Sequence, residues 1–306
     1  MVSHVKQKLR KIILLLVNAL LNNPFIFKLI GKINNRCQWI NSIFIAYPAS
    51  KGYSDAYAFQ KFMPIMKWTP WIAALMKYNG TFGIMMVISG LEKDFQEPNN
   101  QSNLCQLVQR VEKNAKLLNI SHVTFAGILP GILYKSKIRQ KTIEADITIQ
   151  AILNAEKKIQ QELHYSPQTP IIILGNNGFI GSRLIHRLNN RPIYPIDSPS
   201  VDYANIDLWP YQLKDNPCIL INISRNFVLG HYTHLFWPQL IIINDVYPEP
   251  SKEEIDQIKT IGCPLFHIVG VEGKSWPKFP KVYKGGLPCC ATPCTEDLPI
   301  IIQKLQ

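Results

Sequence analysis

The sequence predicts an α/β protein with two domains, each built around a parallel sheet. Short apolar runs rich in β-branched residues alternate with segments that repeat apolar residues at helical spacing, as "IIIL" (171–174) and the following "SRLIHRL" illustrate. This alternation is typical of βαβ units. The chain has 306 residues, of which 47% are hydrophobic and 18% charged, so it can build two hydrophobic cores.

We expect three regions along the chain. Residues 1–38 form a basic, apolar segment. Residues 39–165 form an N-terminal α/β domain that holds the substrate, and residues 166–306 form a C-terminal domain. The sequence shows neither an internal repeat nor a long low-complexity linker.

Strands and helices alternate in the N-terminal domain. Three short apolar runs predict strands: "WINSIFIAYP" (39–48), "FGIMMVIS" (82–89) and "HVTFAGIL" (122–129). Residues 55–78 are aromatic, apolar and interrupted by Pro64 and Pro70, which predicts short helices. Apolar residues at helical spacing predict longer helices over 103–119 and 148–163.

The C-terminal domain begins with a strand, a glycine-rich turn and a helix. Ile171 to Leu174 read as a buried parallel strand, and the helix carries Arg183 and Leu188. Further strands are predicted in three segments: "RPIYPID" (191–197), "CILINIS" (218–224) and "LIIINDVYP" (240–248). Together they predict a Rossmann-like parallel sheet.

The turn "GNNGFIG" (175–181) has the glycine spacing of a dinucleotide-binding loop. Gly175 permits the tight turn, Gly178 lets a pyrophosphate approach the backbone, and Gly181 lets the helix pack closely on the strand. We therefore predict that NAD(H) or NADP(H) binds here, with its pyrophosphate at the start of the helix. The alternative is a Rossmann-like half that keeps its glycines for packing and binds no ligand.

Other residues complete the predicted cofactor site. Asp197 ends the second strand 22 residues after Gly175, where an acidic side chain meets the ribose 2′-hydroxyl of NAD. The remaining members of the predicted cofactor site are Asn176, Asn177, Phe179 and Ile180 in the turn and Ser224 at the end of the third strand. The asparagines tolerate left-handed turn conformations.

The N-terminal segment is strongly basic. The first 54 residues contain eight lysines and arginines and no acid, within a net charge of +12 for the chain. The apolar run Ile12 to Leu21 is too short to span a bilayer, and no small-x-small cleavage site of a signal peptide follows it. We expect the segment to lie on an anionic membrane surface, with an ordinary packing helix as the alternative. Nucleic acid is not expected, because the basic residues alternate with leucine and isoleucine rather than with stacking aromatics.

The seven cysteines indicate a reducing environment. Their number is odd, and they form no regular framework, so we expect a cytoplasmic protein at the membrane periphery. "CCATPC" (289–294) has no partner motif at zinc spacing, and no metal site is predicted. "YPASK" (47–51) has the Tyr-x-x-x-Lys spacing of short-chain dehydrogenases, but it precedes the glycine turn, so we interpret it as chance.

The order of several segments over residues 42–290 resembles a known family. These segments are "DAYAFQKFMPIM", "VEKNAKLLNISHVTFAGIL", "GNNGFIGSRLIHRL", "IIINDVYPEP" and "VYKGG". In this order they resemble the long-chain acyl-(acyl-carrier-protein) reductases, which form fatty aldehydes, and related short-chain-dehydrogenase-like oxidoreductases. The resemblance implies reduction of an acyl thioester or a similar apolar substrate by a nicotinamide cofactor, with acyl carrier protein as a partner.

The resemblance also implies a cysteine nucleophile. The family attacks the thioester with the cysteine of a Cys-x-Ala-Glu segment, and "CCAT" places Cys289 at that position and Thr292 at that of the glutamate. Cys290 and Cys294 are alternative nucleophiles. The sequence also lacks the family's Thr-Thr-Gly-Asn stretch, where it reads "KTIEADITIQ". A non-catalytic, membrane-associated binding or scaffold relative with a degenerate active site is therefore the alternative function.

Overall fold

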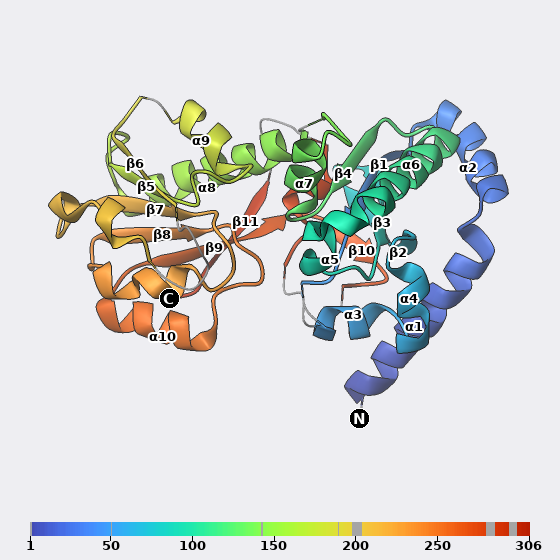
Figure 1. Ribbon diagram of the computed structural model, residues 1–306, viewed down its shortest axis with the longest axis horizontal. Helices are drawn as coiled ribbons and strands as arrows, with labels where there is room; N and C mark the ends of the chain where they lie inside the picture. The colour runs from blue at the N-terminus through green and yellow to red at the C-terminus, as the bar shows by residue number, and fades with distance from the viewer. Residues whose placement is uncertain are drawn as a thin grey trace. The chain divides into compact units, whose positions relative to one another are not determined.

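The computed structural model describes residues 2–49, 51–141, 143–188, 190–197, 204–279, 285–293 and 299–306. The chain divides into two compact units, each with its own sheet (Figure 1). Unit 1 contains Met1–Ile147 and Val271–Thr295, and unit 2 contains Thr148–Gly270 and Glu296–Gln306. The chain therefore passes between the units three times, whereas the sequence predicted one boundary near residue 165.

Unit 1 is an α/β sandwich around a five-stranded sheet of order β10-β2-β3-β1-β4. The strands β1, β3 and β4 are parallel, and β2 and β10 run antiparallel to their neighbours. The strands are β1 (Ile40–Ala46), β2 (Trp71–Tyr78), β3 (Thr81–Val87), β4 (His122–Phe125) and β10 (Lys274–Trp276). The helices are α1 (Val2–Leu21), α2 (Pro24–Cys37), α3 (Lys51–Tyr57), α4 (Met63–Met66), α5 (Glu92–Gln96), α6 (Gln101–Leu118) and α7 (Leu129–Lys135).

The prediction of short helices over residues 55–78 is confirmed for its first part, where α3, η1 (Gln60–Phe62) and α4 lie, and is wrong for residues 71–78. Residues 71–78 form a strand that pairs antiparallel with β3. Asn79 and Gly80 join the two strands with φ angles of 43° and 78°. Positive φ at both central residues is the geometry of a two-residue hairpin turn, for which Asn-Gly is the preferred sequence.

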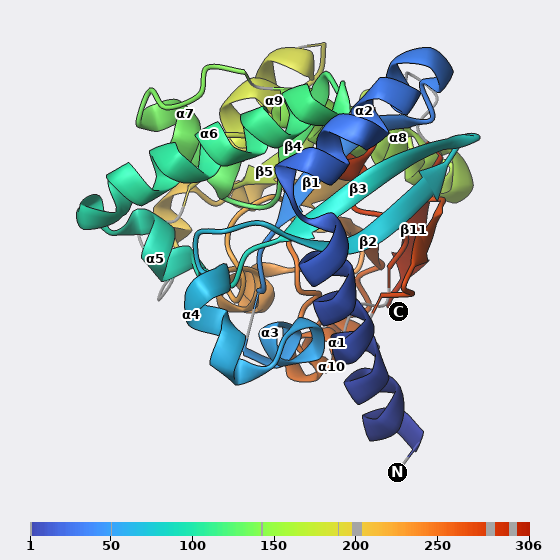
Figure 2. The ribbon, with the colours of Figure 1, turned by 90° about the vertical axis from the view of Figure 1, so that its right-hand side faces the viewer.

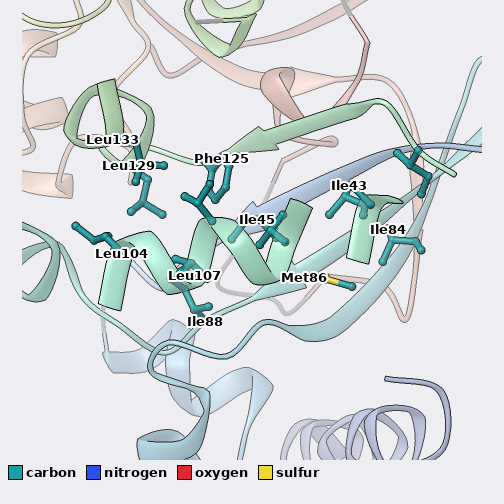
Figure 3. Close-up of a cluster of buried hydrophobic side chains, with 14 of the residues drawn as sticks. Ile43, Ile45, Ile84, Met86, Ile88, Leu104, Leu107, Phe125, Leu129 and Leu133 are labelled. Atoms are coloured by element: carbon teal, nitrogen blue, oxygen red, sulfur yellow. The ribbon is translucent and has the colours of Figure 1, made fainter. Parts of the chain in front are cut away.

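The main core of unit 1 lies between the sheet and helices α6 and α7. Side chains from β1 and β3 point toward α6, with Phe125 of β4 beside them (Figure 3). The central members are fully buried: Ile43, Ile45, Met86, Leu104, Leu107, Phe125, Leu129 and Leu133. Alternate residues of β1 face the other side of the sheet, where Ser42 contacts the returning segment 285–293 through a hydrogen bond to the carbonyl of Ala291 (3.3 Å).

Helices α1 and α2 are integral parts of unit 1. The side-chain amide of Asn18 in α1 donates to the carbonyl of Ile72 (2.8 Å) and accepts from the N–H of the same residue (2.7 Å). Helix α2 crosses α6 so closely that a Cβ on Gly31 would lie 1.9 Å from the carbonyl oxygen of Leu117. Neither helix by itself is long and apolar enough to cross a membrane, but the pair, bent by 83°, meets that test of length and composition.

Unit 2 is a doubly wound parallel domain, as predicted. Its sheet has the order β11-β9-β8-β7-β5-β6, and the pairs from β9 to β6 are parallel. The strands are β5 (Ile171–Leu174), β6 (Ile193–Ile196), β7 (Cys218–Asn222), β8 (Leu240–Asn244), β9 (Leu265–Val271) and β11 (Ile300–Lys304). Helices α8 (Ile143–Leu163) and α9 (Gly181–Arg187) cover one face, and α10 (Lys252–Ile261) covers the other (Figure 1).

The central strands of unit 2 contribute side chains to two hydrophobic cores, one on each face of the sheet. Ile171 and Ile173 of β5 pack with α8 and α9, whereas Ile172 and Leu174 pack with the aromatic cluster of Trp209 and its neighbours. All four β5 residues are completely buried, and so are the apolar residues of β7 and β8. A strand that is buried on both faces needs an uninterrupted apolar sequence, which is why the sequence located these strands well.

Candidate functional site

The candidate site lies at the carboxyl ends of β5 and β7 in unit 2. These strands are neighbours, but the chain continues from β5 to β6 on one side and from β7 to β8 on the other. The loops that follow them therefore diverge. Ligands of open α/β sheets bind at such a topological switch point, outside the carboxyl ends of the strands.

Gly175 brings the two loops into backbone contact. Its φ of +101° lies in the region that side chains avoid, and a Cβ at this position would lie 2.8 Å from both the nitrogen and Cα of Ser224. Its N–H donates to the carbonyl of Ile196 at the end of β6 (2.8 Å). The structure thus brings together Gly175 and Ser224, two residues that the sequence assigned to the cofactor site.

Gly181 and Gly178 have different surroundings. A Cβ on Gly181 would lie 2.3 Å from the carbonyl oxygen of Gly175 and 2.7 Å from the Cα of Asn176, so glycine is needed where α9 meets the turn. A Cβ on Gly178 would meet a single neighbour, the carbonyl oxygen of Gly175 at 3.1 Å, and the residue is exposed. The fold therefore requires the first and third glycines, whereas the middle one leaves an open approach to the backbone.

The turn carries a positive charge. The guanidinium of Arg183 lies 4.2 Å from the ring centroid of Phe179 and donates to the carbonyl of the same residue (2.7 Å). Asn176 donates to the side chain of Asn177 (3.0 Å). Helix α9 has only seven residues. Arg183 thus places a positive charge beside the turn, which would favour an anion there.

Asp197 directly follows the strand that is bonded to the turn. The preceding residue, Ile196, accepts hydrogen bonds from the N–H groups of both Gly175 and Asn176. The backbone carbonyl of Asp197 accepts from Asn205 (3.2 Å), and the residue is half-buried. Its place beside the glycine turn is the one that the ribose-binding role requires, although that role itself remains a prediction.

A row of polar side chains runs from the half-buried Ser224 to the buried Asn222, Asn244 and His267 across three strands. Ser224 donates to Asn222 Oδ1 (2.5 Å), and Asn222 Nδ2 donates to Asn244 Oδ1 (2.7 Å). Asn244 Nδ2 lies 2.9 Å from Nδ1 of His267 and also donates to the carbonyl of Val246 (2.8 Å). We call these four side chains, Ser224, Asn222, Asn244 and His267, the polar row.

His267 ends the polar row as a buried, neutral imidazole. Burial is the main cause that lowers its pKa, and its ring stacks on Tyr247 with centroids 6.1 Å apart. Its Nε2 has no hydrogen-bond partner among the described residues. Of the polar row, Ser224 alone was among the residues predicted from the sequence. The missed signal was an asparagine closing each of two apolar strands, "CILIN" and "LIIIN".

Cys289 lies in unit 1, on the short 3₁₀ helix η6 (Cys289–Ala291). This helix contacts β1 and β4, and the Thr292 hydroxyl donates to the carbonyl of Cys289 (3.1 Å). Cys289 and Cys290 are both half-buried. In contrast, burial raises the pKa of the Cys218 and Cys263 thiols to about 12, as suits packing residues. Cys294 lies outside the described residues.

Tyr47 of the "YPASK" segment has a defined place in unit 1. Its hydroxyl donates to Glu92 (2.9 Å) and accepts from the N–H of Ile128 (3.0 Å). Burial raises the pKa of Tyr47, with smaller contributions from Glu92 and from Cys290 nearby. The hydroxyl therefore links the ends of β1 and β4, close to the cysteine-bearing segment.

Comparison with known proteins finds distant structural neighbours. No protein-family model matches the sequence, and no curated protein matches it. An L-tryptophan dehydrogenase from Nostoc punctiforme shares 10% identity at a TM-score of 0.30 over 74% of this chain and 69% of that one. A putative malic enzyme shares 12% at a TM-score of 0.32 over 81% and 69%. The NAD+-bound 3-phosphoglycerate dehydrogenase of Entamoeba histolytica shares 12% at a TM-score of 0.28 over 74% and 86%.

Proposed function

We propose that unit 2 binds NAD(H) or NADP(H) and that the protein is an oxidoreductase. One observation carries the proposal: the glycine turn, the loop of Ser224 and the end of β6 at Asp197 meet at the switch point of a doubly wound sheet. In such sheets the first glycine-rich turn holds the pyrophosphate, and the acid after the second strand binds the ribose.

Each residue of the site has a defined task in this proposal. The exposed backbone at Gly178 lets the pyrophosphate approach, and Arg183 on the turn supplies charge. Asp197 accepts hydrogen bonds from the ribose hydroxyls, which favours NAD over its 2′-phosphorylated form. Ser224, oriented by Asn222, offers a hydroxyl to the cofactor beyond the pyrophosphate. The bound nicotinamide would supply or accept a hydride.

The finer proposal concerns the substrate. We infer that the protein reduces an acyl thioester or a similar apolar substrate through an acyl-enzyme on Cys289. The order of the sequence motifs supports this, and so does the contrast between the half-buried Cys289 and the fully buried Cys218 and Cys263. Acyl carrier protein is the proposed donor of the acyl group.

A non-catalytic binding protein is the second candidate. The family that the sequence resembles has a glutamate directly after the alanine of the cysteine segment, whereas here Thr292 stands at that position and donates its hydroxyl to the carbonyl of Cys289. This observation favours a protein that holds an apolar ligand and a nucleotide without turnover.

We expect the purified protein to bind NADH more tightly than NADPH in a fluorescence titration. Asp197→Ala should lower the affinity for NADH by about tenfold, because a charge-assisted pair of hydrogen bonds to the ribose is lost. The affinity for NADPH should change much less. Asp207→Ala, at an exposed carboxylate of the same unit, is the matched control. Failure of the wild-type protein to bind either nucleotide would reject the proposed function.

The cysteine assignment can be tested by acylation. Incubation with a long-chain acyl thioester should label the wild-type protein, and Cys289→Ser should remove the label and leave NADH binding unchanged. Cys290→Ser is the control, because it keeps the thiol of Cys289 and should therefore keep the label. A label that follows Cys290 would move the nucleophile by one residue. If nucleotide binds but no thioester acylates the protein, the non-catalytic candidate is favoured.

A further inference from the structure

Helix α1 carries an exposed apolar stripe along its length. The stripe consists of Val5, Leu9, Ile12, Leu16 and Leu20, whose side chains are between 41% and 67% exposed. Their spacing of three and four residues places them on one face of the helix. Single exposed apolar residues are ordinary on protein surfaces, but five in a row on one face mark an interaction surface.

The stripe lies opposite the face by which α1 is fixed to unit 1. Leu14 and Asn18 are buried, and Asn18 bonds to the backbone of β2 at Ile72. At about 100° per residue, these two positions fall on the side of the helix away from Leu16 and Leu20. Helix α1 is thus bound to unit 1 through Leu14 and Asn18, and its opposite, apolar face is exposed.

Helix α2 repeats this arrangement. Phe27, Gly31 and Asn34 face the protein, and Asn34 Nδ2 donates to the carbonyls of Ile40 (2.7 Å) and Leu118 (3.2 Å). The opposite face exposes Phe25, Leu29 and Ile33, which are between 50% and 76% exposed. Both helices lie on the outer side of unit 1, in front of its sheet in Figure 2.

Basic residues border both stripes, and acidic residues are absent from this region of the sequence. Lys6 and Lys8 flank the stripe of α1, and Lys28, Lys32 and Arg36 accompany that of α2; all five are exposed. The first acid of the chain is Asp55. An apolar stripe between rows of cations is complementary to a lipid bilayer, which has apolar acyl chains below a layer of anionic headgroups.

We propose that the exposed faces of α1 and α2 dock unit 1 onto an anionic lipid bilayer. The two helix axes meet at a break of two residues with a bend of 83°. Two axes that meet lie in one plane, and in this proposal the bilayer lies parallel to that plane. The helices lie in the interface and do not enter the hydrocarbon core, because their opposite faces are bound to protein. A second copy of this chain fits the surface poorly, since two strongly basic faces would repel each other.

Vesicle sedimentation tests the proposal on the full chain. The protein should pellet with vesicles of phosphatidylcholine and phosphatidylglycerol and bind pure phosphatidylcholine vesicles far more weakly. Leu16→Gln with Leu20→Gln should lower the affinity at least about tenfold, because two apolar side chains no longer insert. Ile65→Gln with Leu208→Gln, which changes exposed apolar residues outside both stripes, should leave binding unchanged.

A variant with fewer charges separates the electrostatic contribution to membrane binding from that of the apolar side chains. Replacing Lys6, Lys8, Lys28 and Lys32 by glutamine should lower the affinity for anionic vesicles at least about 100-fold and leave the weak binding to neutral vesicles unchanged. Circular dichroism should show the wild-type fold in every variant, since all of these side chains are exposed. The proposal is overturned if the wild type stays in the supernatant with anionic vesicles. It is also overturned if the leucine variant pellets like the wild type, or if the stripes mediate a dimer that does not bind lipid.

Discussion

Gly178→Val is expected to abolish NADH binding while unit 2 stays folded. The Cβ of a valine at this position would meet, among the described residues, the carbonyl oxygen of Gly175 at 3.1 Å, and we expect the rest of the side chain to occupy the space through which a pyrophosphate would approach. The affinity should fall at least about 100-fold, a free-energy loss on the order of 3 kcal/mol. The overpacking against one carbonyl should cost only about 1 kcal/mol of folding free energy. Nucleotide titration together with thermal unfolding measures both effects.

Gly175→Ala gives the contrasting result that makes the first variant interpretable. At a φ of +101°, and with the Ser224 backbone 2.8 Å away, even a methyl group forces the loops after β5 and β7 apart. This variant should lose stability and nucleotide binding together. If Gly178→Val binds NADH as the wild type does, the glycines serve packing alone and the cofactor site lies elsewhere.

Asn244→Leu should destabilise unit 2 by about 3 kcal/mol or more. Leucine has the branched shape of asparagine but a larger volume, and it leaves the buried Nδ2 of Asn222 without its partner. It also removes the side-chain hydrogen bonds to the carbonyl of Val246 and to Nδ1 of His267, which then faces the backbone carbonyl of residue 244 (3.1 Å). Each unsatisfied buried group costs about 1–3 kcal/mol. Hydrogen exchange of the β7 and β8 amides is the suitable measurement, because it reports unit 2 separately from unit 1.

Two further variants test whether the loss of stability in Asn244→Leu comes from the polar row. Asn216→Leu removes an exposed hydrogen bond to the carbonyl of Lys214 and should change stability by less than about 0.5 kcal/mol. Asn222→Leu combined with Asn244→Leu should cost less than the sum of the single changes, because the two side chains are hydrogen-bonded partners. Additive losses would show that the row consists of independent contacts.

The sequence predicted unit 2 well because its strands are buried on both faces. Such strands read as continuous runs of isoleucine and leucine, and the glycine turn follows the first of them directly. The hairpin strand β2 was missed because aromatic residues and Pro70 suggested broken helices, although Asn79-Gly80 marked its turn. Helix α10 was also missed, although its Ser251 and Glu254 form a capping box.

The arrangement of the two units could not be predicted from local patterns. Strand β10 has three residues, and its pairing of Lys274 with Lys77 joins segments almost 200 residues apart in sequence. A pairing of this kind depends on the whole fold rather than on periodicity. The asparagines of the polar row were invisible for a related reason, since an asparagine at the end of a strand looks like the first residue of a loop.

The threefold passage of the chain between the units has a consequence for synthesis on the ribosome. Unit 1 is completed by Val271–Thr295, which emerges only after the core strands β5 to β9 of unit 2. At typical translation rates this delay is on the order of ten seconds. During that time the edge of β2 at Leu75 to Lys77 lacks the strand that covers it. A nascent chain with an open sheet edge is prone to pair with other chains, so we expect chaperones to matter most for the N-terminal half of this protein.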